Sequence, residues 1–233
     1  MFTKRIEKMA NLLPAGKVVA DIGTDHAYLP VYLIKNSIVP RVIAVELNPG
    51  PLEAAKNTVA KYGLQGKVEL RRGDGLKPIM PGEAAAAVIA GMGGATINSI
   101  LAESLEVAKS LKKIILQPMS DAHLVRSYLQ SHGFRLVDEE LVLEDNRYYE
   151  VLVVQPGDSS EFDDIMLEIG PILFSKRHPL LAGYLEEKIC HYKQIIDSLD
   201  RSCKVGAQEK KQYFEEKVYF LEKVISCLLD VPR

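Results

Sequence analysis

The sequence predicts an α/β fold, in which a parallel, doubly wound sheet ends in an antiparallel hairpin and a helical hairpin follows as a second domain. Five short apolar runs between residues 18 and 116 alternate with segments of helical spacing, which is typical of parallel strands joined by crossover helices. Two longer strand-like runs, 134–143 and 148–154, flank the turn-forming residues 144–146 and predict the antiparallel pair. Apolar residues recurring at steps of three and four near the C-terminus predict the two helices.

Each element of the first domain follows from its local pattern. Apolar residues at helical spacing, from Phe2 to Leu13, predict an amphipathic helix over residues 2–13 that ends at Pro14-Ala15-Gly16. Further helices are expected from Leu29 onward, over 52–62 after a break at 48–51, and over 95–110. Strands are predicted at 18–22, 40–46, 68–71, 86–90 and 113–116, where short apolar runs stop at acidic residues, glycine or proline.

The second domain begins after a polar stretch at 155–160 that contains proline and glycine, so the predicted domains are residues 1–156 and 157–233. A polar turn at 200–206 separates two regions of helical periodicity. Their apolar stripes are Leu185, Ile189, Tyr192, Ile196 and Leu199, then Phe214, Val218, Leu221, Ile225 and Leu228. Two helices of about 20 residues would pair as an antiparallel coiled coil, and we interpret the stripes as their seam rather than as a cofactor site.

Composition and charge exclude several function classes. With 233 residues, 47% of them hydrophobic, the chain can bury a sizeable core, and a net charge of −2 provides no overall positive field for nucleic acid. Cys190, Cys203 and Cys227 form no C-x-x-C pair, which favours free thiols in a reducing cytosol. The sequence lacks a signal-peptide pattern and an apolar span of about 20 residues, so we expect a cytoplasmic protein without a membrane partner.

Neither metal ligands nor oligomer contacts can be recognised in the sequence. His123 and His132 are nine residues apart and no Cys or His residues are grouped elsewhere, so no metal site is expected. The oligomeric state stays open, and a monomer is compatible with the pattern.

The ends of four predicted parallel strands carry acids and glycines. The first ends in Asp21-Ile22-Gly23, the second in Glu46 followed by Leu47, the third in Gly73-Asp74-Gly75, and the fourth in Gly91-Met92-Gly93-Gly94. In an open parallel sheet, ligands bind outside the carboxyl ends of the strands, where the strand order reverses. Each acid alone is equally well explained as a helix cap or turn former. Their occurrence at successive strand ends favours one common binding cradle.

The residue types in this cradle suit an adenosine with a cationic tail. Glu46 can accept hydrogen bonds from both ribose hydroxyls, and Asp74, flanked by glycines, can accept from the adenine amino group. Asp21, or a backbone carbonyl near it, can neutralise an amino-acid end. A dinucleotide is disfavoured, because Asp25 and Ala27 stand where the second and third glycines of G-x-G-x-x-G would be, and a carboxylate there would repel phosphates.

These features are similar to those of class I S-adenosylmethionine-dependent methyltransferases, whose related Rossmann-like sheet is also closed by an antiparallel last strand. More closely, four segments resemble the bacterial TrmK family: Ala20-Asp21-Ile22-Gly23-Thr24-Asp25-His26-Ala27-Tyr28-Leu29-Pro30, Gly73-Asp74-Gly75-Leu76, Ile89-Ala90-Gly91-Met92-Gly93-Gly94 and Ile115-Leu116-Gln117-Pro118. The resemblance covers nearly the whole chain. It implies methylation of N1 of adenine 22 in tRNA, S-adenosyl-L-methionine as cofactor, and a C-terminal coiled-coil domain.

Carried onto this chain, the resemblance implies which residues contact the cofactor. The expected set, with the neighbours of each motif residue, is Asp21, Ile22, Gly23, Glu46, Leu47, Gly73, Asp74, Gly75, Gly91 and Met92. One departure concerns catalysis. Many base methyltransferases end the fourth strand with Asn or Asp-Pro-Pro-Tyr/Phe, whose side chain holds the target nitrogen, whereas Gly91-Met92-Gly93-Gly94 offers only backbone.

The chemistry tolerates this departure, because N1 of neutral adenine already carries an in-plane lone pair and needs no prior loss of a proton. Catalysis can then consist mostly of alignment, together with acceptors for the N6 hydrogens. We expect Asp25 or His26, with Tyr28 nearby, to contact the target adenine. The alternative for His26 is a purely structural histidine.

Recognition of a folded tRNA calls for basic residues away from the cradle. The candidates are Lys4, Arg5 and Lys8, then Arg71-Arg72, Lys112-Lys113, Lys176-Arg177-His178 and Lys210-Lys211, although such pairs also occur on ordinary solvated faces. Residues 157–233 carry 11 Lys and Arg against 14 Asp and Glu, so the C-terminal domain is no polycation. Two other functions stay open: methylation of a small-molecule or protein acceptor, and a non-catalytic sensor of an adenosyl ligand.

Overall fold

A computed structural model describes residues 2–201 and 206–229. The chain divides into two compact units, Met1–Glu161 and Phe162–Arg233. The predicted domain boundary after Pro156 coincides with the end of the last strand, and the two units divide after Glu161.

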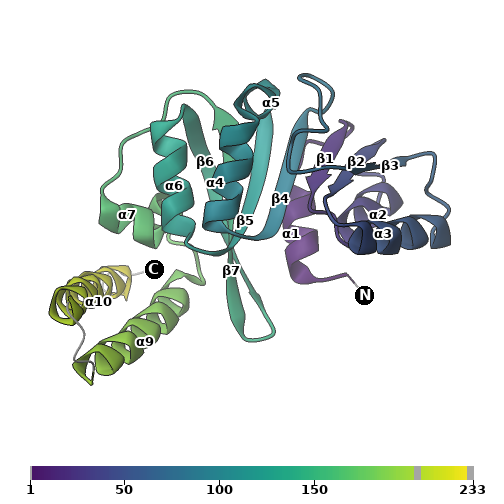
Figure 1. Ribbon diagram of the computed structural model, residues 1–233. Helices are drawn as coiled ribbons and strands as arrows, with labels where there is room; N and C mark the ends of the chain where they lie inside the picture. Colours follow the sequence, from purple (N-terminus) through teal and green to yellow (C-terminus); the bar gives the residue numbers. More distant parts are fainter. Residues whose placement is uncertain (1, 202–205, 230–233) are drawn as a thin grey trace. The chain divides into compact units, whose positions relative to one another are not determined.

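The first unit is built on one seven-stranded sheet with the order β3-β2-β1-β4-β5-β7-β6 (Figure 1). Its strands are β1 Val19–Ile22, β2 Val42–Glu46, β3 Val68–Arg72, β4 Ala86–Gly93, β5 Lys113–Ser120, β6 Phe134–Glu144 and β7 Arg147–Pro156. β1 to β5 are parallel, while β7 is antiparallel to both β5 and β6. The predicted parallel sheet with a terminal antiparallel hairpin is therefore confirmed. Asp145 and Asn146 make the hairpin turn with positive φ angles of 48° and 57°.

Six helices of the described residues cover this sheet: α1 Lys4–Leu12, α2 Tyr28–Lys35, α3 Pro49–Lys61, α4 Gly94–Glu103, α5 Leu105–Ser110 and α6 Ala122–Ser131. The predicted break at 48–51 is wrong, because the helix begins at Pro49 and the first turn of a helix tolerates proline. The single helix predicted over 95–110 is also wrong, since the backbone leaves helical geometry at Ser104. Sequence reasoning missed α6, whose apolar stripe is interrupted by the buried Arg126.

Side chains from alternate positions of the strands form two hydrophobic cores, one on each face of the sheet. Ala20 and Ile22 pack into one core and Val19 into the other. This alternation follows from the twofold side-chain period of a strand, and a parallel sheet covered on both faces is apolar on both. Because both faces of the sheet are covered, only the ends of its strands are available to bind a ligand.

The second unit is helical, with α7 Asp164–Ile169, α8 Pro171–Ser175, α9 Leu181–Asp200 and α10 Ala207–Leu229. The predicted helix pair is confirmed, and Leu185, Ile189 and Tyr192 of α9 are buried, as are Val218 and Leu221 of α10. α7 and α8 were missed by sequence reasoning. Residues 202–205 of the predicted turn, Cys203 among them, lie outside the described residues, whereas Cys190 and Cys227 are exposed free thiols.

A buried carboxylate connects three helices of this unit. Glu168 of α7 is 1% exposed; it pairs with Lys188 of α9 and Lys217 of α10, and it accepts a hydrogen bond of 2.6 Å from the Tyr192 hydroxyl. Burial by itself would raise the pKa of Glu168, but the two ammonium groups and the hydroxyl outweigh burial and hold this pKa well below its usual range. The ion cluster adds a directional contact to the apolar seam.

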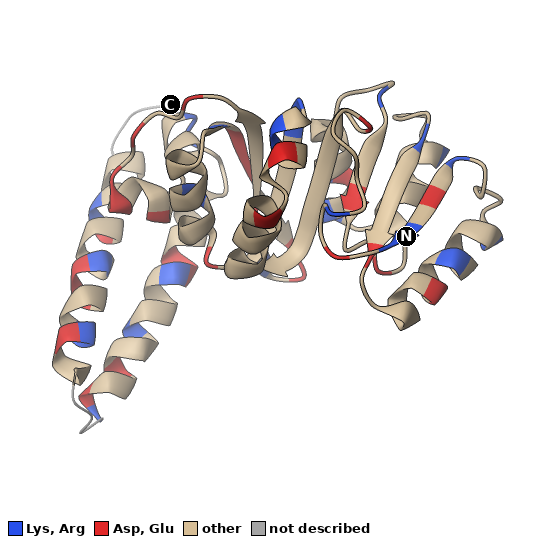
Figure 2. Ribbon diagram, turned by 45° about the horizontal axis from the view of Figure 1, so that its top comes forward, with Lys and Arg blue, Asp and Glu red and all other residues tan. Residues whose placement is uncertain are grey.

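Charges of both signs are mixed along the long helices of the second unit. Figure 2 shows Lys and Arg alternating with Asp and Glu on α9 and α10. Lys193 pairs with Glu222 and Lys211 with Asp200 at the surface. Within residues 2–201 and 206–229, the helices are all too short or too polar to cross a membrane.

Candidate functional site

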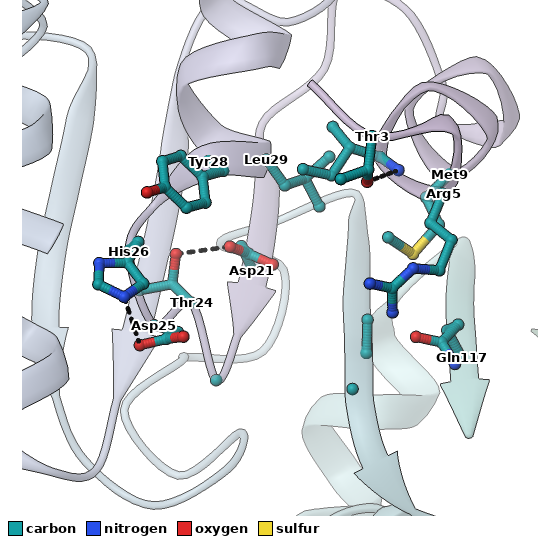
Figure 3. A pocket seen from close by; sticks show the side chains of 14 residues that line it. Thr3, Arg5, Met9, Asp21, Thr24, Asp25, His26, Tyr28, Leu29 and Gln117 are labelled. Atoms are coloured by element: carbon teal, nitrogen blue, oxygen red, sulfur yellow. Dashed lines mark hydrogen bonds and ion pairs between the residues drawn. The ribbon is translucent and has the colours of Figure 1, made fainter. Parts of the chain in front are cut away.

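The strand order reverses between β1 and β4, since β2 continues the sheet on one side and β5 on the other. Ligands of open parallel sheets bind at the carboxyl ends of the strands beside such a reversal. A cavity of about 260 Å³ opens there. Figure 3 shows Asp21, Thr24, Asp25, His26 and Tyr28 along one side of it, and Arg5, Met9 and Gln117 along the other.

Asp21, the acidic residue of β1, is buried in the lining of this cavity. Asp21 is 5% exposed and accepts a hydrogen bond of 2.6 Å from the Thr24 hydroxyl. Burial raises the pKa of Asp21 to about 6, the Thr24 hydrogen bond partly opposes this shift, and the nearby charge of Glu46 adds to it. Asp21 therefore changes its charge close to physiological pH and is ionised in most molecules at pH 7.

The loop after β1 is held in a conformation that requires glycine. The amides of Gly23 and Thr24 donate to the same carbonyl, that of Val45 in β2, at 2.9 and 3.0 Å. Gly23 has a φ of +73°, and a Cβ built on it would lie 2.2 Å from the Met92 methyl carbon. The positive φ selects glycine here, whereas the flexible Met92 side chain could move away from a Cβ. Asp25 and Ala27 follow with positive φ angles of 45° and 58°, which turn the chain into α2.

Glu46, the acidic residue at the end of β2, binds the backbone of the loop after β1 and of the loop after β2. Glu46 is 6% exposed, and its two carboxylate oxygens accept hydrogen bonds from the amides of Asp25, at 3.3 Å, and Asn48, at 2.8 Å. Each oxygen keeps a further lone pair for a ligand donor. Leu47, the next residue, is 52% exposed.

The glycines after β3 are also closely packed. The Gly73 amide donates to the Glu46 carbonyl at 3.0 Å, and a Cβ on Gly73 would lie 2.1 Å from Cγ of Pro78. Asp74 is bound by Lys77 at 2.6 Å, and both line a second cavity of about 80 Å³, together with Gly75. Asp74 thus lies at the expected strand end, but its carboxylate is engaged by a lysine.

The predicted residues fall into two groups. Six of them line the larger cavity: Asp21, Gly23, Asp25, His26, Tyr28 and Gly91. Gly73, Asp74, Gly75, Glu46 and Leu47 lie at or beside the neighbouring strand ends, outside that lining. The Met92 side chain lies against Gly23, which lines the cavity. The Ile22 side chain is packed in the core, so only the Ile22 backbone is available to a ligand.

The residues at the start of α2 are at the mouth of the cavity. The ring of His26 stacks on that of Tyr28, with centroids 5.4 Å apart and planes inclined by 26°. His26 Nε2 lies 3.7 Å from the nearer Asp25 carboxylate oxygen, and their side chains are 48% and 64% exposed. His26 is therefore not a core histidine satisfied by burial. The stacked pair offers an aromatic surface.

Sequence reasoning missed one wall of the cavity, which comes from α1. Thr3, Arg5, Ile6 and Met9 line it, and carboxylates of the β6–β7 hairpin hold the helix in place. Glu144 accepts from Arg5 Nε at 2.9 Å and from the Lys4 amide at 2.6 Å, and Glu140 pairs with Lys8 at 2.9 Å. No local sequence pattern relates residues this far apart.

Thr24, Leu29, Ala90 and Gln117 also line the cavity and were not predicted. A signal for Gln117 was present, because it is the first polar residue after the apolar run of β5 and so follows the same strand-end rule as Asp21 and Glu46. Among the described residues, His, Cys, Asp and Glu side chains form no group of three or more that could hold a metal ion.

The sheet order, the acids at its strand ends and the glycine-requiring loop after β1 define the class: the fold is that of the class I S-adenosylmethionine-dependent methyltransferases. The family model of the tRNA (adenine(22)-N(1))-methyltransferases, TrmK, matches residues 19–223. The chain belongs to the TrmK family.

Similar proteins agree with this membership. The tRNA (adenine(22)-N(1))-methyltransferase of Bacillus subtilis is 36% identical over 231 residues, which is 96% of each chain. The crystal structure of the B. subtilis TrmK superposes with a TM-score of 0.85, covering 97% of this chain and 99% of that one, at 33% identity.

Two further structures contain ligands. A Streptococcus pneumoniae protein in complex with S-adenosyl-L-methionine has a TM-score of 0.83 at 30% identity, covering 97% of this chain and 100% of that one. M. capricolum TrmK in complex with S-adenosyl-homocysteine has a TM-score of 0.81 at 26% identity, covering 98% of this chain and 99% of that one.

The raised pKa of Asp21 predicts how stability depends on pH. The folded chain binds more protons at this carboxyl than the unfolded chain, so its contribution to the free energy of unfolding falls as the pH rises from about 4 through about 6. Asp21→Asn keeps an acceptor for Thr24 without the buried charge. We expect it to be more stable than wild type by about 2 kcal/mol at pH 7 and not at pH 4. Thermal unfolding at both pH values measures this difference. The exposed Asp25→Asn is the matched control, and an equal effect of both substitutions would contradict the assignment.

Proposed function

We propose that this protein transfers the methyl group of S-adenosyl-L-methionine to N1 of adenine 22 in tRNA, and that the donor and the base meet in the 260 Å³ cavity. The observation that carries the proposal is the position of this cavity at the reversal of strand order. The buried carboxylate of Asp21 lies there, together with two glycines of positive φ, Gly23 after β1 and Gly91 within β4. Because tRNA is the substrate, the proposal also places the protein in the cytoplasm.

The residues at the strand ends fit the proposed cofactor. S-adenosyl-L-methionine, when bound, supplies a methyl group on a positively charged sulfur. Ionised Asp21 attracts the cationic methionine end, and Gly23 and Gly91 let the backbone approach it closely. Glu46 accepts from the ribose hydroxyls through lone pairs that its two amide contacts leave available.

The same set extends along the neighbouring strand ends. Backbone groups of Ile22, Leu47, Gly73 and Gly75, and the side chain of Met92, complete the proposed cradle. Asp74 accepts from the adenine amino group of the cofactor once its carboxylate turns away from Lys77, an exchange that is feasible because the Lys77–Asp74 pair is half exposed. The nucleoside then lies toward β2 and β3, and the methionine end toward β4.

Methyl transfer requires alignment rather than proton removal. Adenine N1 carries a lone pair in the plane of its ring, and attack on the methyl carbon forms the N–C bond while the electron pair of the broken C–S bond stays on sulfur. The methylated base is a cation, which can release an N6 proton to solvent after the transfer. The chain's residues hold the two reactants in line, which is an effect that can amount to several kcal/mol.

The target base has to leave its stack and its pairing partner before it can react, because N1 lies on the Watson–Crick edge. The His26–Tyr28 pair at the mouth of the cavity supports this step, since an extruded purine can stack on an aromatic surface. Asp25, beside His26, is positioned to accept from the base.

Transfer of labelled methyl groups tests the function directly. With labelled S-adenosyl-L-methionine, we expect the protein to modify a tRNA transcript that carries adenine at position 22 and to leave the same transcript with guanine 22 unmodified, because N1 of guanine carries a hydrogen instead of a lone pair. Mapping the methylated nucleotide measures the outcome. Label in a metabolite pool or in protein, with none in tRNA, would favour the other acceptors.

The residues at the cavity mouth generate a second expectation. Asp25→Ala and His26→Ala should each lower kcat/KM for tRNA methylation by about 10- to 100-fold, because a contact to the positioned base is lost, while cofactor affinity stays within about twofold of wild type. Initial rates and calorimetry give the two values. Tyr28→Phe keeps the stacking surface and serves as the control. Wild-type rates in both alanine variants would exclude this role.

Shape, rather than a strong positive field, supports recognition of the tRNA. Several of the candidate cations are engaged within the protein: Arg5 and Lys8 by the hairpin carboxylates, Arg71 by Glu83, Lys113 by the Leu12 carbonyl and Lys211 by Asp200. The exposed candidates are Lys4, Arg72, Lys112, Lys176, Arg177 and Lys210, whereas His178 is buried. They are scattered over both units, which suits contacts to a few phosphates of a folded RNA.

Truncation separates the roles proposed for the two units. A chain of residues 1–161 contains every residue that lines the larger cavity, so we expect it to bind S-adenosyl-L-methionine with unchanged affinity. Its kcat/KM for tRNA should fall at least about 100-fold, mainly through KM, because the helical unit no longer contacts the RNA. Calorimetry with the cofactor controls for folding. Full activity of the truncated chain would contradict the proposed role of residues 162–233.

A further inference from the structure

One buried polar atom at the cavity has no partner in the part of the chain that the structure describes. Gln117, at the end of β5, is 1% exposed and lines the cavity. Its Nε2 donates to the Pro118 carbonyl at 2.9 Å, and this contact orients the amide, because the reverse orientation would place two oxygens against each other. The other end of the amide, Oε1, is buried without a hydrogen bond among the described residues.

An unpartnered buried acceptor costs about 1–3 kcal/mol, so such an atom calls for an explanation. Figure 3 shows the oxygen of Gln117 directed toward the interior of the cavity and its nitrogen turned away. A ligand donor in the cavity would satisfy this oxygen.

The strand order indicates which part of the reaction lies beside Gln117. Gln117 is the register partner of Ala90, and Ala90 and Gly91 border the same cavity. Glu46 and Asp74, proposed to hold the nucleoside of the cofactor, belong to the ends of β2 and β3, on the opposite side of the reversal. With the methionine end placed toward β4, the β5 side of the cavity, where Gln117 lies, is left for the acceptor base.

Other polar side chains near this side are already engaged. Arg5 is held by Glu144 and lies over the ring of Tyr149, with 4.1 Å from its guanidinium carbon to the ring centre. The Thr3 hydroxyl accepts from the Ile6 amide as the N-cap of α1. Residues 91–94 of β4 and α4 contribute no polar side chain. Gln117 therefore offers an acceptor where the Asn or Asp of other base methyltransferases is absent from β4.

We propose that Oε1 of Gln117 accepts a hydrogen bond from the N6 amino group of the target adenine and so orients N1 toward the methyl group. This inference rests on the proposed function. N6 is bonded to the ring carbon next to N1, so an in-plane acceptor for N6 also fixes the direction of the N1 lone pair. As N1 becomes methylated, positive charge spreads to N6, and its hydrogen bond to the amide oxygen strengthens as the transition state forms.

The same contact selects adenine against guanine. Guanine carries an oxygen at the corresponding ring position, and this oxygen would face the buried amide oxygen of Gln117, acceptor against acceptor. A neutral amide also accepts from N6 without removing its proton, so the cationic product is not trapped by a bound carboxylate.

The contact between Gln117 and N6 is tested by a cycle that combines one change in the tRNA with one change in the protein. The substrates are tRNA with adenine 22 and the same tRNA with unsubstituted purine at position 22, which keeps N1 and lacks the N6 amino group. The proteins are wild type and Gln117→Met, which matches glutamine in length but has no amide. We expect Gln117→Met to lower kcat/KM about 10- to 100-fold on adenine 22 and less than about threefold on purine 22, with cofactor affinity within about twofold of wild type.

The control is Gln155→Met, the same chemical change on β7, outside the lining of the cavity, where we expect wild-type rates on both tRNAs. Equal losses on both tRNAs in Gln117→Met would show a merely structural role and overturn the proposal. Wild-type protein that methylates purine 22 as fast as adenine 22 would overturn it as well, whatever the variant does.

A second variant covers the case in which Gln117→Met no longer binds cofactor. Gln117→Glu keeps an acceptor oxygen, so its preference for adenine 22 over purine 22 should equal or exceed that of wild type, and loss of the preference would overturn the proposal. Wild-type protein that binds cofactor but leaves adenine 22 unmodified would overturn the proposed function and this inference together. If the wild type is active, but the losses caused by Gln117→Met and by purine 22 are additive, only the assignment of Gln117 is overturned.

Discussion

The attachment of the loop after β1 to the neighbouring strand β2 is the constraint on which the site depends. Two consecutive amides, of Gly23 and Thr24, donate to the Val45 carbonyl, and the next amide, of Asp25, donates to the Glu46 carboxylate. These bonds hold the backbone in the left-handed region at Gly23 and Asp25. They place Asp21 and the start of α2 at the cavity and Glu46 beside it, so the geometry of the cradle follows from backbone hydrogen bonds more than from side-chain packing.

The site retains polar groups that the fold alone would not favour. The Asp21 carboxyl is buried where ionisation is costly, and the Gln117 amide oxygen is buried without a partner in the described residues. The two apolar cores on either face of the sheet keep both groups in place, because moving either strand end would disrupt many contacts of Ile22 and Leu116. Such preorganised groups gain their partners when a ligand binds, which is how a rigid scaffold favours one ligand geometry.

The wall formed by α1 shows how distant parts of the first unit contribute to one cavity. The hairpin β6–β7 supplies no residue to its lining, yet Glu140 and Glu144 at its end anchor α1 through Lys8 and Arg5. The hairpin that closes the sheet thereby also positions the helix that closes the cavity. In the second unit, the buried Glu168 has the corresponding role, since it connects three helices with one carboxylate.

The sequence by itself determined the parallel sheet, its antiparallel closure, the helix pair and the acids and glycines at strand ends, because these depend on local periodicity and on residues next to one another. It did not predict α6, where Arg126 interrupts the apolar stripe, or the helix start at Pro49. Only the tertiary structure decided that α1 and Gln117 line the cavity and that the carboxylates of the β6–β7 hairpin hold α1 in place. The physical reason is that these relations join side chains from elements far apart in the chain, and their contacts arise from packing and strand order, which no local pattern encodes.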